Sequence, residues 1–187
     1  MFYELEIQSH VRLPPSNFDD KNLEKTLKER LNEQYEGKID KDWGIILAIK
    51  EISKVGEGVI VPGDGAAYYD TNFKILTFKP EIQEVVLGTV TDITDFGVFF
   101  DIGAIDGMIH VSQTMDDFVS ISKVGVLTGK ESKKVLKTKD KCKARIVAVS
   151  YKDLNNPKIG LTMRQPGLGN LQWLVDDKKK ATKEDKE

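Results

Sequence analysis

The stretch from Asp95 to Ser112 constrains the fold most, because its apolar residues alternate with residues of other kinds. With a period of two, Val98, Phe100 and Ile102 fall on one face of an extended strand and Phe99 falls on the other. Glycines then mark a turn, and a second alternating segment follows. The stretch therefore predicts a β-hairpin with one face toward a core.

The opposite face of this predicted hairpin carries Phe99 and His110, and Phe96 joins them because Gly97 lets the backbone bend between the two phenylalanines. Exposed aromatic rings suit single-stranded nucleic acid, since every base has a π-face and stacking contributes about 1–3 kcal/mol per base. A phenylalanine on a strand more often packs in a core. The period alone leaves both interpretations open.

The composition indicates a folded protein of a reducing compartment. The chain has 187 residues, of which 40% are hydrophobic and 31% charged, which suits one large or two small domains. No apolar run reaches the ~20 residues of a membrane span, and the N-terminus does not have the pattern of a signal peptide. The single cysteine, Cys142, excludes an internal disulfide; its setting predicts a small buried strand residue. We therefore expect a cytoplasmic protein with no membrane partner.

Charge is unevenly distributed, although the net charge is only -2. Residues 1–81 carry 11 basic and 15 acidic side chains, whereas residues 123–145 carry nine basic and two acidic ones. Such a local excess can bind phosphates, and a solvated lysine face is the alternative. A strand predicted over residues 141–149 would direct Cys142, Ala144, Ile146 and Ala148 inward. It would direct Lys141, Lys143 and Arg145 outward.

The N-terminal part predicts one strand, one helix and several antiparallel strands. Residues 2–11 alternate like a half-buried strand, which the loop His10–Pro15 ends. Leucines at four-residue spacing up to Tyr35 form one apolar helix stripe, which ends at Gly37. Ser16 or Asn17 could cap this helix, with Asp19 and Asp20 in its first turn. Further strands are expected over residues 43–52, 59–61, 66–69 and 73–78. This order resembles a truncated ferredoxin-like or RNP-type domain.

Two segments of this part are unusual for a free surface: the loop His10–Pro15 and the apolar, glycine-rich segment Val59–Tyr69. Exposed apolar loops often mark a protein interface. The sequence Gly63-Asp-Gly65 does not have the third glycine or the following helix of a dinucleotide fingerprint. We interpret it as a tight turn.

From residue 84 onward the pattern predicts short strands only. Strands over residues 86–93, 141–149 and 158–164, together with the hairpin, make five, which match a closed OB-type barrel that binds oligonucleotides. Asn155-Asn-Pro157 is expected to turn the chain, and residues 113–139 form an insertion whose structure the pattern does not predict. Leu171, Trp173, Leu174 and Val175 could dock on a domain, and residues 176–187 are expected to be disordered. The fold class is α+β, mostly β, with domains over residues 1–81 and 82–165 and a C-terminal segment over 166–187.

Three motifs in the second part resemble the S1 RNA-binding domain. They are Gly88-x-Val90-x-x-Ile93-x-x-Phe96-Gly-Val-Phe99, Gly107-Met-Ile-His110-Val-Ser112 and Lys158-Ile-Gly-Leu-Thr162. The resemblance implies that RNA contacts Phe96, Phe99, His110 and Lys158. An acidic residue that such domains often place near the end of the fourth strand has no clear match here, with Tyr151 and Asp153 nearby.

Nearly the whole chain is similar to the E-prime family of archaeal DNA-directed RNA polymerase subunits, through Met-Phe-Tyr-Glu-Leu-Glu, His10–Pro15, Val61–Ala66 and Thr162–Gly169. The resemblance implies a non-catalytic stalk protein that forms a heterodimer with the F subunit of the RNA polymerase, binds the emerging single-stranded transcript and favours the open promoter complex. It also implies that an N-terminal "tip" domain docks on the polymerase core. The implied core contacts are His10, Val11, Arg12, Leu13, Pro14, Val61, Pro62, Gly63, Asp64 and Gly65.

Two other functions share parts of this pattern. A free-standing S1 protein of translation or RNA decay would need the barrel but not the tip loops. A nuclease would need clustered carboxylates with metal ions. The pair Asp116–Asp117 stands in a basic insertion without further ligands. His10 and His110 are the only histidines, and nothing near them suggests a nucleophile partner. We therefore predict no catalytic residue, no metal site and no cofactor.

Overall fold

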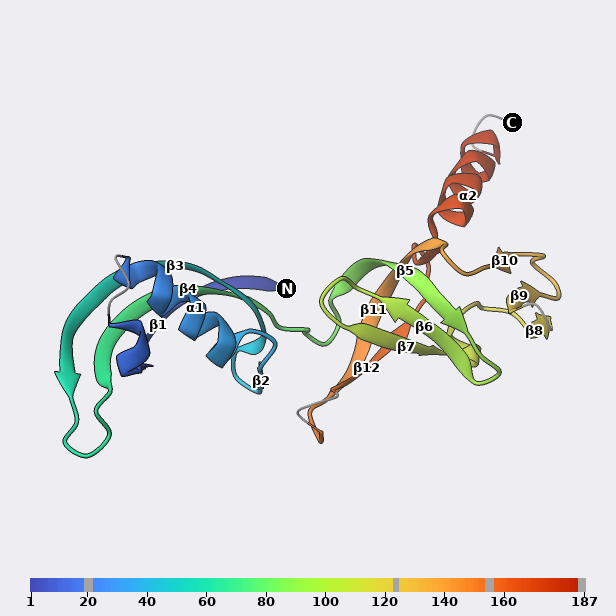
Figure 1. The fold of residues 1–187 in the computed structure, drawn as a ribbon. Helices are drawn as coiled ribbons and strands as arrows, with labels where there is room; N and C mark the ends of the chain where they lie inside the picture. The colour runs from blue at the N-terminus through green and yellow to red at the C-terminus, as the bar shows by residue number, and fades with distance from the viewer. Residues whose placement is uncertain (19–21, 123–124, 154–156, 185–187) are drawn as a thin grey trace. The chain divides into compact units, whose positions relative to one another are not determined.

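The computed structural model describes residues 1–18, 22–122, 125–153 and 157–184 (Figure 1). The chain divides into two units, Met1–Lys79 and Pro80–Glu187. The predicted α+β, mostly β class is confirmed. No helix in the described part of the chain combines the length and the apolar character that crossing a bilayer requires.

The first unit is an antiparallel sheet with one helix packed on it. Its elements are β1 (Phe2–Leu13), the short 3-10 helix η1 (Pro15–Asn17), α1 (Leu23–Tyr35), β2 (Ile39–Asp40), β3 (Gly44–Ile60) and β4 (Ala67–Phe78). The strand order is β1-β4-β3-β2. Strands β3 and β4 form a long, curved hairpin that extends beyond α1 (Figure 1).

The apolar stripe of α1 explains how the helix binds the sheet. Leu27 and Leu31 are fully buried in one core with Val11, Phe73 and Ile75 from the strands. The predicted stripe and the end at Gly37 are therefore confirmed, and Gly37 adopts a φ of +75° that favours glycine.

The predicted helix cap was wrong. Asn22 is the N-cap, and its side chain accepts a hydrogen bond from the backbone N–H of Lys25 at 3.2 Å. Ser16 and Asn17 lie instead in η1, where Pro15 fixes a tight turn before the helix starts. Asp19 and Asp20 lie outside the described residues.

The strands of this unit are longer than the sequence predicted. Residues 43–61 were expected to form two strands and form one, β3; residues 66–78 likewise form only β4. Register shifts in the β3–β4 ladder, such as the one between Ile46 and Ala48, interrupt the alternation without ending the pairing. The expected loop at His10 was also wrong, because β1 stays paired to β4 through Leu13 and ends only at the prolines.

The second unit is a five-stranded barrel with additions. Its barrel strands are β5 (Val85–Ile93), β6 (Gly97–Asp101), β7 (Asp106–His110), β11 (Lys141–Ser150) and β12 (Lys158–Thr162). The sheet order is β12-β7-β6-β5-β11-β13, and β11 also pairs with β12, which closes the barrel. The predicted OB-type barrel is confirmed. Val90, Phe100, Ile109, Ile146 and Leu161 lie in its buried interior.

The insertion whose structure was not predicted folds as a small sheet of its own. After the 3-10 helix η2 (Val111–Gln113), the strands β8 (Val119–Ser122), β9 (Val126–Gly129) and β10 (Val135–Leu136) pair in the order β10-β9-β8. Leu127 and Leu136 of this sheet are fully buried.

Two predictions at the end of the chain were wrong. Ala148 is exposed, since a register shift after Ile146 breaks the inward–outward alternation of β11. Residues 176–184, which were expected to be disordered, belong to α2 (Leu171–Glu184), which follows the short strand β13 (Gly169–Asn170). An ion pair of 3.0 Å between Lys134 and Asp177 links α2 to the insertion. Asn155, Asn156 and residues 185–187 lie outside the described residues.

Candidate nucleic-acid interface

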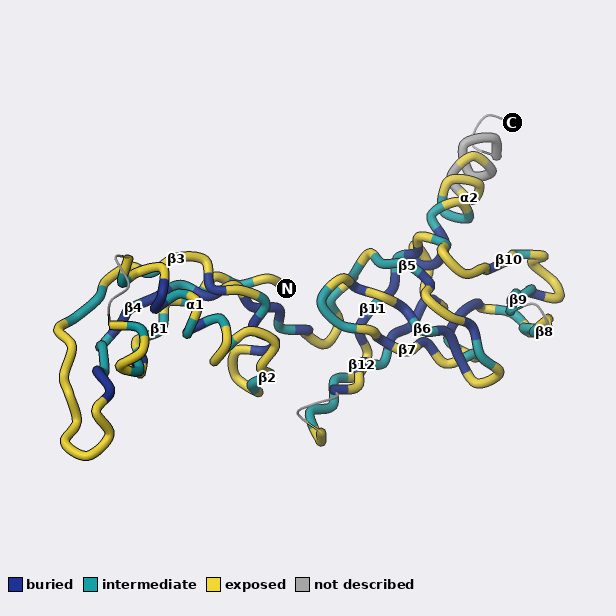
Figure 2. The backbone as a smooth tube through the Cα atoms, in the orientation of Figure 1, coloured by how far each residue is buried: buried dark blue, intermediate teal, exposed yellow. Residues whose placement is uncertain are grey.

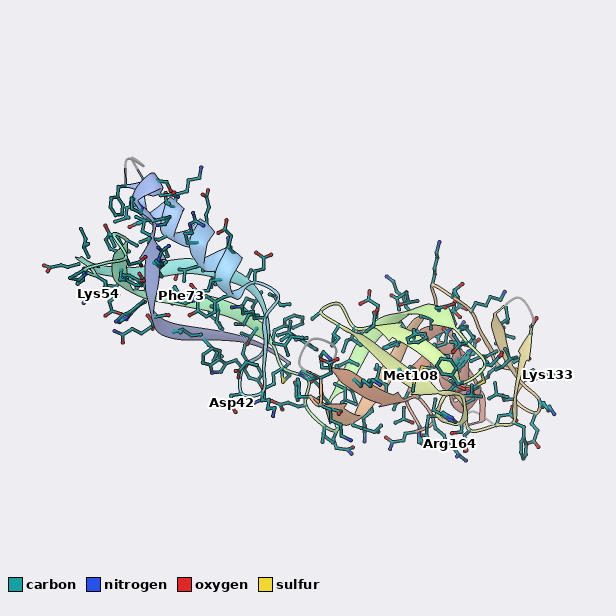
Figure 3. All side chains as sticks on the ribbon, turned by 60° about the horizontal axis from the view of Figure 1, so that its bottom comes forward. Asp42, Lys54, Phe73, Met108, Lys133 and Arg164 are labelled. Atoms are coloured by element: carbon teal, nitrogen blue, oxygen red, sulfur yellow. The ribbon has the colours of Figure 1, made fainter. Side chains whose placement is uncertain are left out.

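The hairpin of β6 and β7 presents one row of side chains outward. In the antiparallel register Phe99 is opposite Met108, and Gly97 is opposite His110. Between these pairs, Val98 and Ile109 are fully buried in the barrel. Met108, labelled in Figure 3, is 39% exposed. The period of two therefore predicted correctly which side chains of the hairpin face the barrel interior and which face outward.

The two aromatic rings predicted to bind RNA lie on this face and touch each other. Phe96 is 54% exposed and Phe99 is half-buried, whereas the neighbouring Phe100 is fully buried. The ring centroids of Phe96 and Phe99 are 6.1 Å apart, and the ring planes meet edge to face at 87°. This arrangement stabilises both ring positions and leaves ring surface open for a base. The alternative that both phenylalanines belong to the core is excluded.

His110 is held by its own turn. Its Nδ1 accepts a hydrogen bond from the backbone N–H of Ser112 at 3.3 Å and lies 2.8 Å from the hydroxyl of that serine. Because Nδ1 accepts, the proton of the neutral ring is on Nε2. Gly97, opposite His110, has no side chain that could cover the ring. The exposed His110 therefore offers a hydrogen-bond donor beside the aromatic pair.

Lys158 lies on the neighbouring strand but at the other end of the hairpin. Strand β12 runs parallel to β7 and pairs Ile159 with Gly107. Lys158 is therefore beside the start of β7, whereas His110 is at its end. The exposed Lys158 could contact a backbone phosphate of a strand that passes over Met108.

The three basic residues predicted on β11 do not join the aromatic face. The sheet order places β5 between β11 and β6. Lys141, Lys143 and Arg145 pair with Thr89, Leu87 and Val85 of β5. Next to Thr89 in β6 is an acidic residue, Asp101. The structure therefore separates this basic row from the rings by one strand and by a carboxylate.

The acidic pair of the insertion has structural partners. Asp116 accepts a hydrogen bond of 2.8 Å from Nε of Arg164. Asp117 accepts from the backbone N–H groups of Ser132 and Glu131 at 2.8 and 3.0 Å, and from the Ser132 hydroxyl. These bonds, the N–H of Ser132 first, lower the pKa of Asp117. Within the described residues no group of three or more His, Cys, Asp or Glu side chains could hold a metal ion.

The tip of the β3–β4 hairpin is the second surface that the sequence singled out. Residues 57–65 are all exposed, as Figure 2 shows in yellow, and Val59, Ile60 and Val61 are 62%, 61% and 44% exposed. Gly63 and Gly65 have φ values of +96° and +69°, as the predicted tight turn requires. An apolar edge of this kind is typical of a protein contact.

A hydrogen-bonded cluster fixes the turn against β1. Arg12 donates from Nε to Oδ2 of Asp64 at 2.9 Å and from Nη2 to Oδ1 at 2.6 Å, and the Tyr68 hydroxyl donates to Oδ2 at 2.7 Å. The Arg12 hydrogen bonds hold the pKa of Asp64 well below its usual range. Two predicted contact residues do not belong to this surface: Val11 and Leu13 are each 1% exposed, because β1 continues through them and directs them into the core.

The sequence reasoning did not single out Phe118, although it is 74% exposed. It follows two acidic residues, Asp116 and Asp117, and lies just before β8, so the alternation of that strand does not mark it. The only available signal was a phenylalanine outside any apolar pattern.

Comparisons with known proteins match both units. Residues 8–65 match the family described as "SHS2 domain found in N terminus of Rpb7p/Rpc25p/MJ0397". Residues 79–150 match the family described as "S1 RNA binding domain". The DNA-directed RNA polymerase subunit Rpo7 of Saccharolobus solfataricus is 40% identical over 181 residues, covering 96% of this chain and 100% of that relative. The chain belongs to the Rpo7 family of DNA-directed RNA polymerase subunits.

Other members and relatives of the Rpo7 family agree. Rpo7 of Saccharolobus shibatae is 41% identical, again over 96% of this chain and 100% of that protein. The DNA-directed RNA polymerase III subunit RPC8 of Bos taurus is 28% identical over 109 residues, or 58% of this chain and 53% of that relative. The resemblance to the archaeal polymerase family is confirmed. The S1 match contains Phe96, Phe99 and His110, and the SHS2 match contains the tip turn.

Proposed function

We propose that this chain is a non-catalytic stalk component of an archaeal RNA polymerase, working in the cytoplasm. In this proposal the tip docks on the polymerase core, the chain pairs with the F subunit, and the S1 barrel binds the emerging transcript and supports open-complex formation. Membership of the Rpo7 family supports the assignment to the polymerase. The finer roles rest on the two surfaces described above.

The RNA role is carried by one observation: Phe96 and Phe99 lie on the outer surface of a barrel that matches the S1 RNA-binding family. Phenylalanines on strands are usually buried in the core, so two rings on the outer surface are unusual. Stacking on such rings binds bases with little sequence preference. A transcript of any sequence could therefore cross this face, with the Nε2–H of His110 as a further contact.

The docking role is supported by the hydrogen-bonded turn and the exposed apolar side chains of the tip. The hydrogen bonds among Arg12, Asp64 and Tyr68 tie the turn to β1. A preordered loop loses less conformational entropy when it binds. We propose that the exposed members of the predicted set, with Val61 and Pro62 at the centre, enter an apolar pocket of the core.

Assembly with tagged polymerase core and with the F subunit tests the proposal. Val61→Glu adds one negative charge to the exposed apolar edge and should abolish capture by the core. Gln34→Glu adds the same charge to an exposed position of α1 and should leave capture unchanged. If the unmodified chain is captured by neither partner, the stalk assignment fails, and a free-standing RNA-binding protein becomes the better explanation.

A further inference from the structure

A groove borders the aromatic face in the second unit. It has a volume of about 510 Å³, within the range of about 300–1,000 Å³ common for small-ligand sites. It lies between the end of β7 and the insertion. The side chains that carry the argument below are those of His110, Asp116, Asp117, Phe118, Glu131 and Arg164.

Phe118 supplies a stacking surface in this groove. Its ring is the most exposed among the large hydrophobic side chains of the described residues, at 74%. The backbone that presents it is fixed, because its carbonyl accepts a hydrogen bond of 2.9 Å from the N–H of Lys130. The neighbouring Asp117 closes the same loop through its bonds to Ser132, and the absence of a side chain at Gly129 makes room for that carboxylate. A hydrogen-bonded loop therefore presents the Phe118 ring to solvent.

The charges of the groove suit a base better than a phosphate. Arg164 lines the groove, and its guanidinium already forms an ion pair of 2.8 Å with Asp116. The carboxylates of Asp117 and Glu131 also line the groove, so its net charge is negative and repels phosphate. Carboxylates accept hydrogen bonds from exocyclic amino groups, which cytosine, adenine and guanine carry and uracil does not.

The groove is continuous with the proposed RNA face, because His110 belongs to both. A strand that stacks on Phe96 and Phe99 and passes His110 would reach Phe118 next. We propose that Phe118 stacks on a further base of the same RNA, and that the adjoining carboxylates favour a base with an exocyclic amino group. This inference rests on the proposed RNA role of the S1 barrel.

The test compares oligocytidine with oligouridine, two pyrimidine strands that differ at position 4 by an amino group and an oxygen. Affinities for the full chain are measured by fluorescence anisotropy at fixed salt. We expect oligocytidine to bind more tightly. Phe118→Ala should weaken oligocytidine binding by about 5- to 150-fold and abolish the preference. Glu131→Gln keeps the shape of the side chain and should reduce the preference while oligouridine binding does not fall.

Matched variants separate the two proposals. Leu87→Ala removes another exposed apolar side chain, 63% exposed, outside the groove, and should bind both strands like the unmodified chain. If Phe99→Ala weakens binding and Phe118→Ala does not, the groove proposal is overturned and the RNA role stands. If neither variant weakens binding, the proposed RNA role of this face is refuted, and the groove proposal that rests on it is refuted as well. If Phe118→Ala weakens both strands equally and Glu131→Gln changes nothing, the amino-group preference is overturned.

Discussion

Phe96→Ala should weaken RNA binding while the barrel stays folded. The side chain is 54% exposed, so the fold gains only part of the about 1.5–3 kcal/mol that full burial of such a side chain gives. Its edge-to-face contact with Phe99 adds about 0.5–1.5 kcal/mol. We expect the free energy of unfolding to fall by about 1–3 kcal/mol. Phe100→Ala, in the fully buried interior, should cost about 3–5 kcal/mol.

The effect of Phe96→Ala on RNA binding should be the loss of one stacked base. A base stacked on Phe96 contributes about 1–3 kcal/mol, so affinity for a single strand should fall by about 5- to 150-fold. Because the two rings touch, Phe96→Ala and Phe99→Ala should not be additive, and the double variant should lose less than the sum of the single losses. Anisotropy titrations with labelled RNA and denaturant unfolding of the same preparations measure both quantities. Unchanged RNA affinity in both single variants, with folding intact, would refute the assignment of this face.

Three further predictions address other parts of the chain. Leu31→Ala should lower the free energy of unfolding by about 2–5 kcal/mol, measured with denaturant, because this fully buried side chain joins α1 to the sheet; a loss below about 1 kcal/mol would contradict that packing. Because β5 separates Lys141, Lys143 and Arg145 from the aromatic rings, replacing the three by glutamine should leave the salt slope of RNA binding nearly unchanged; a fall of about 2, at about 0.7 per phosphate contact, would show that the basic row lies on the RNA path. The lowered pKa of Asp64 means that its contribution to stability is complete above the ordinary aspartate pKa and is lost as the pH falls through the lower, folded-state pKa. Asp64→Asn should therefore remove part of the acid-induced loss of stability, and parallel curves for both proteins would exclude this contribution.

The barrel and its outer face could be predicted because they depend on local alternation. Phe99 and Phe100 take opposite faces for no reason beyond the period of a strand, and the hairpin keeps that period without interruption. Where register shifts occur, as after Ile146, the same reasoning places Ala148 on the wrong face. Bulges depend on the partner strand, which a single stretch of sequence does not reveal.

The insertion and the C-terminal helix could not be predicted because distant contacts hold them. Asp117 organises a loop by accepting bonds from residues 14 and 15 positions later. Asp177 pairs with Lys134 of the loop between β9 and β10, and the Lys134 ammonium lies 5.7 Å from the centre of the Trp173 ring. Composition alone made this charged segment resemble a disordered tail. Phe118 was overlooked for the same reason, since its position depends on the loop that Asp117 closes.

Because β7 pairs in parallel with β12, the sheet that carries the proposed RNA face is complete only when the last barrel strand is present. Gly107 and Ile159 become neighbours only after the ribosome has delivered the last barrel strand. Until then the edge of β7 has unpaired backbone groups, which can recruit strands of other molecules. A chain that ends inside the insertion would therefore leave this edge of the hairpin unpaired beside Phe96 and Phe99.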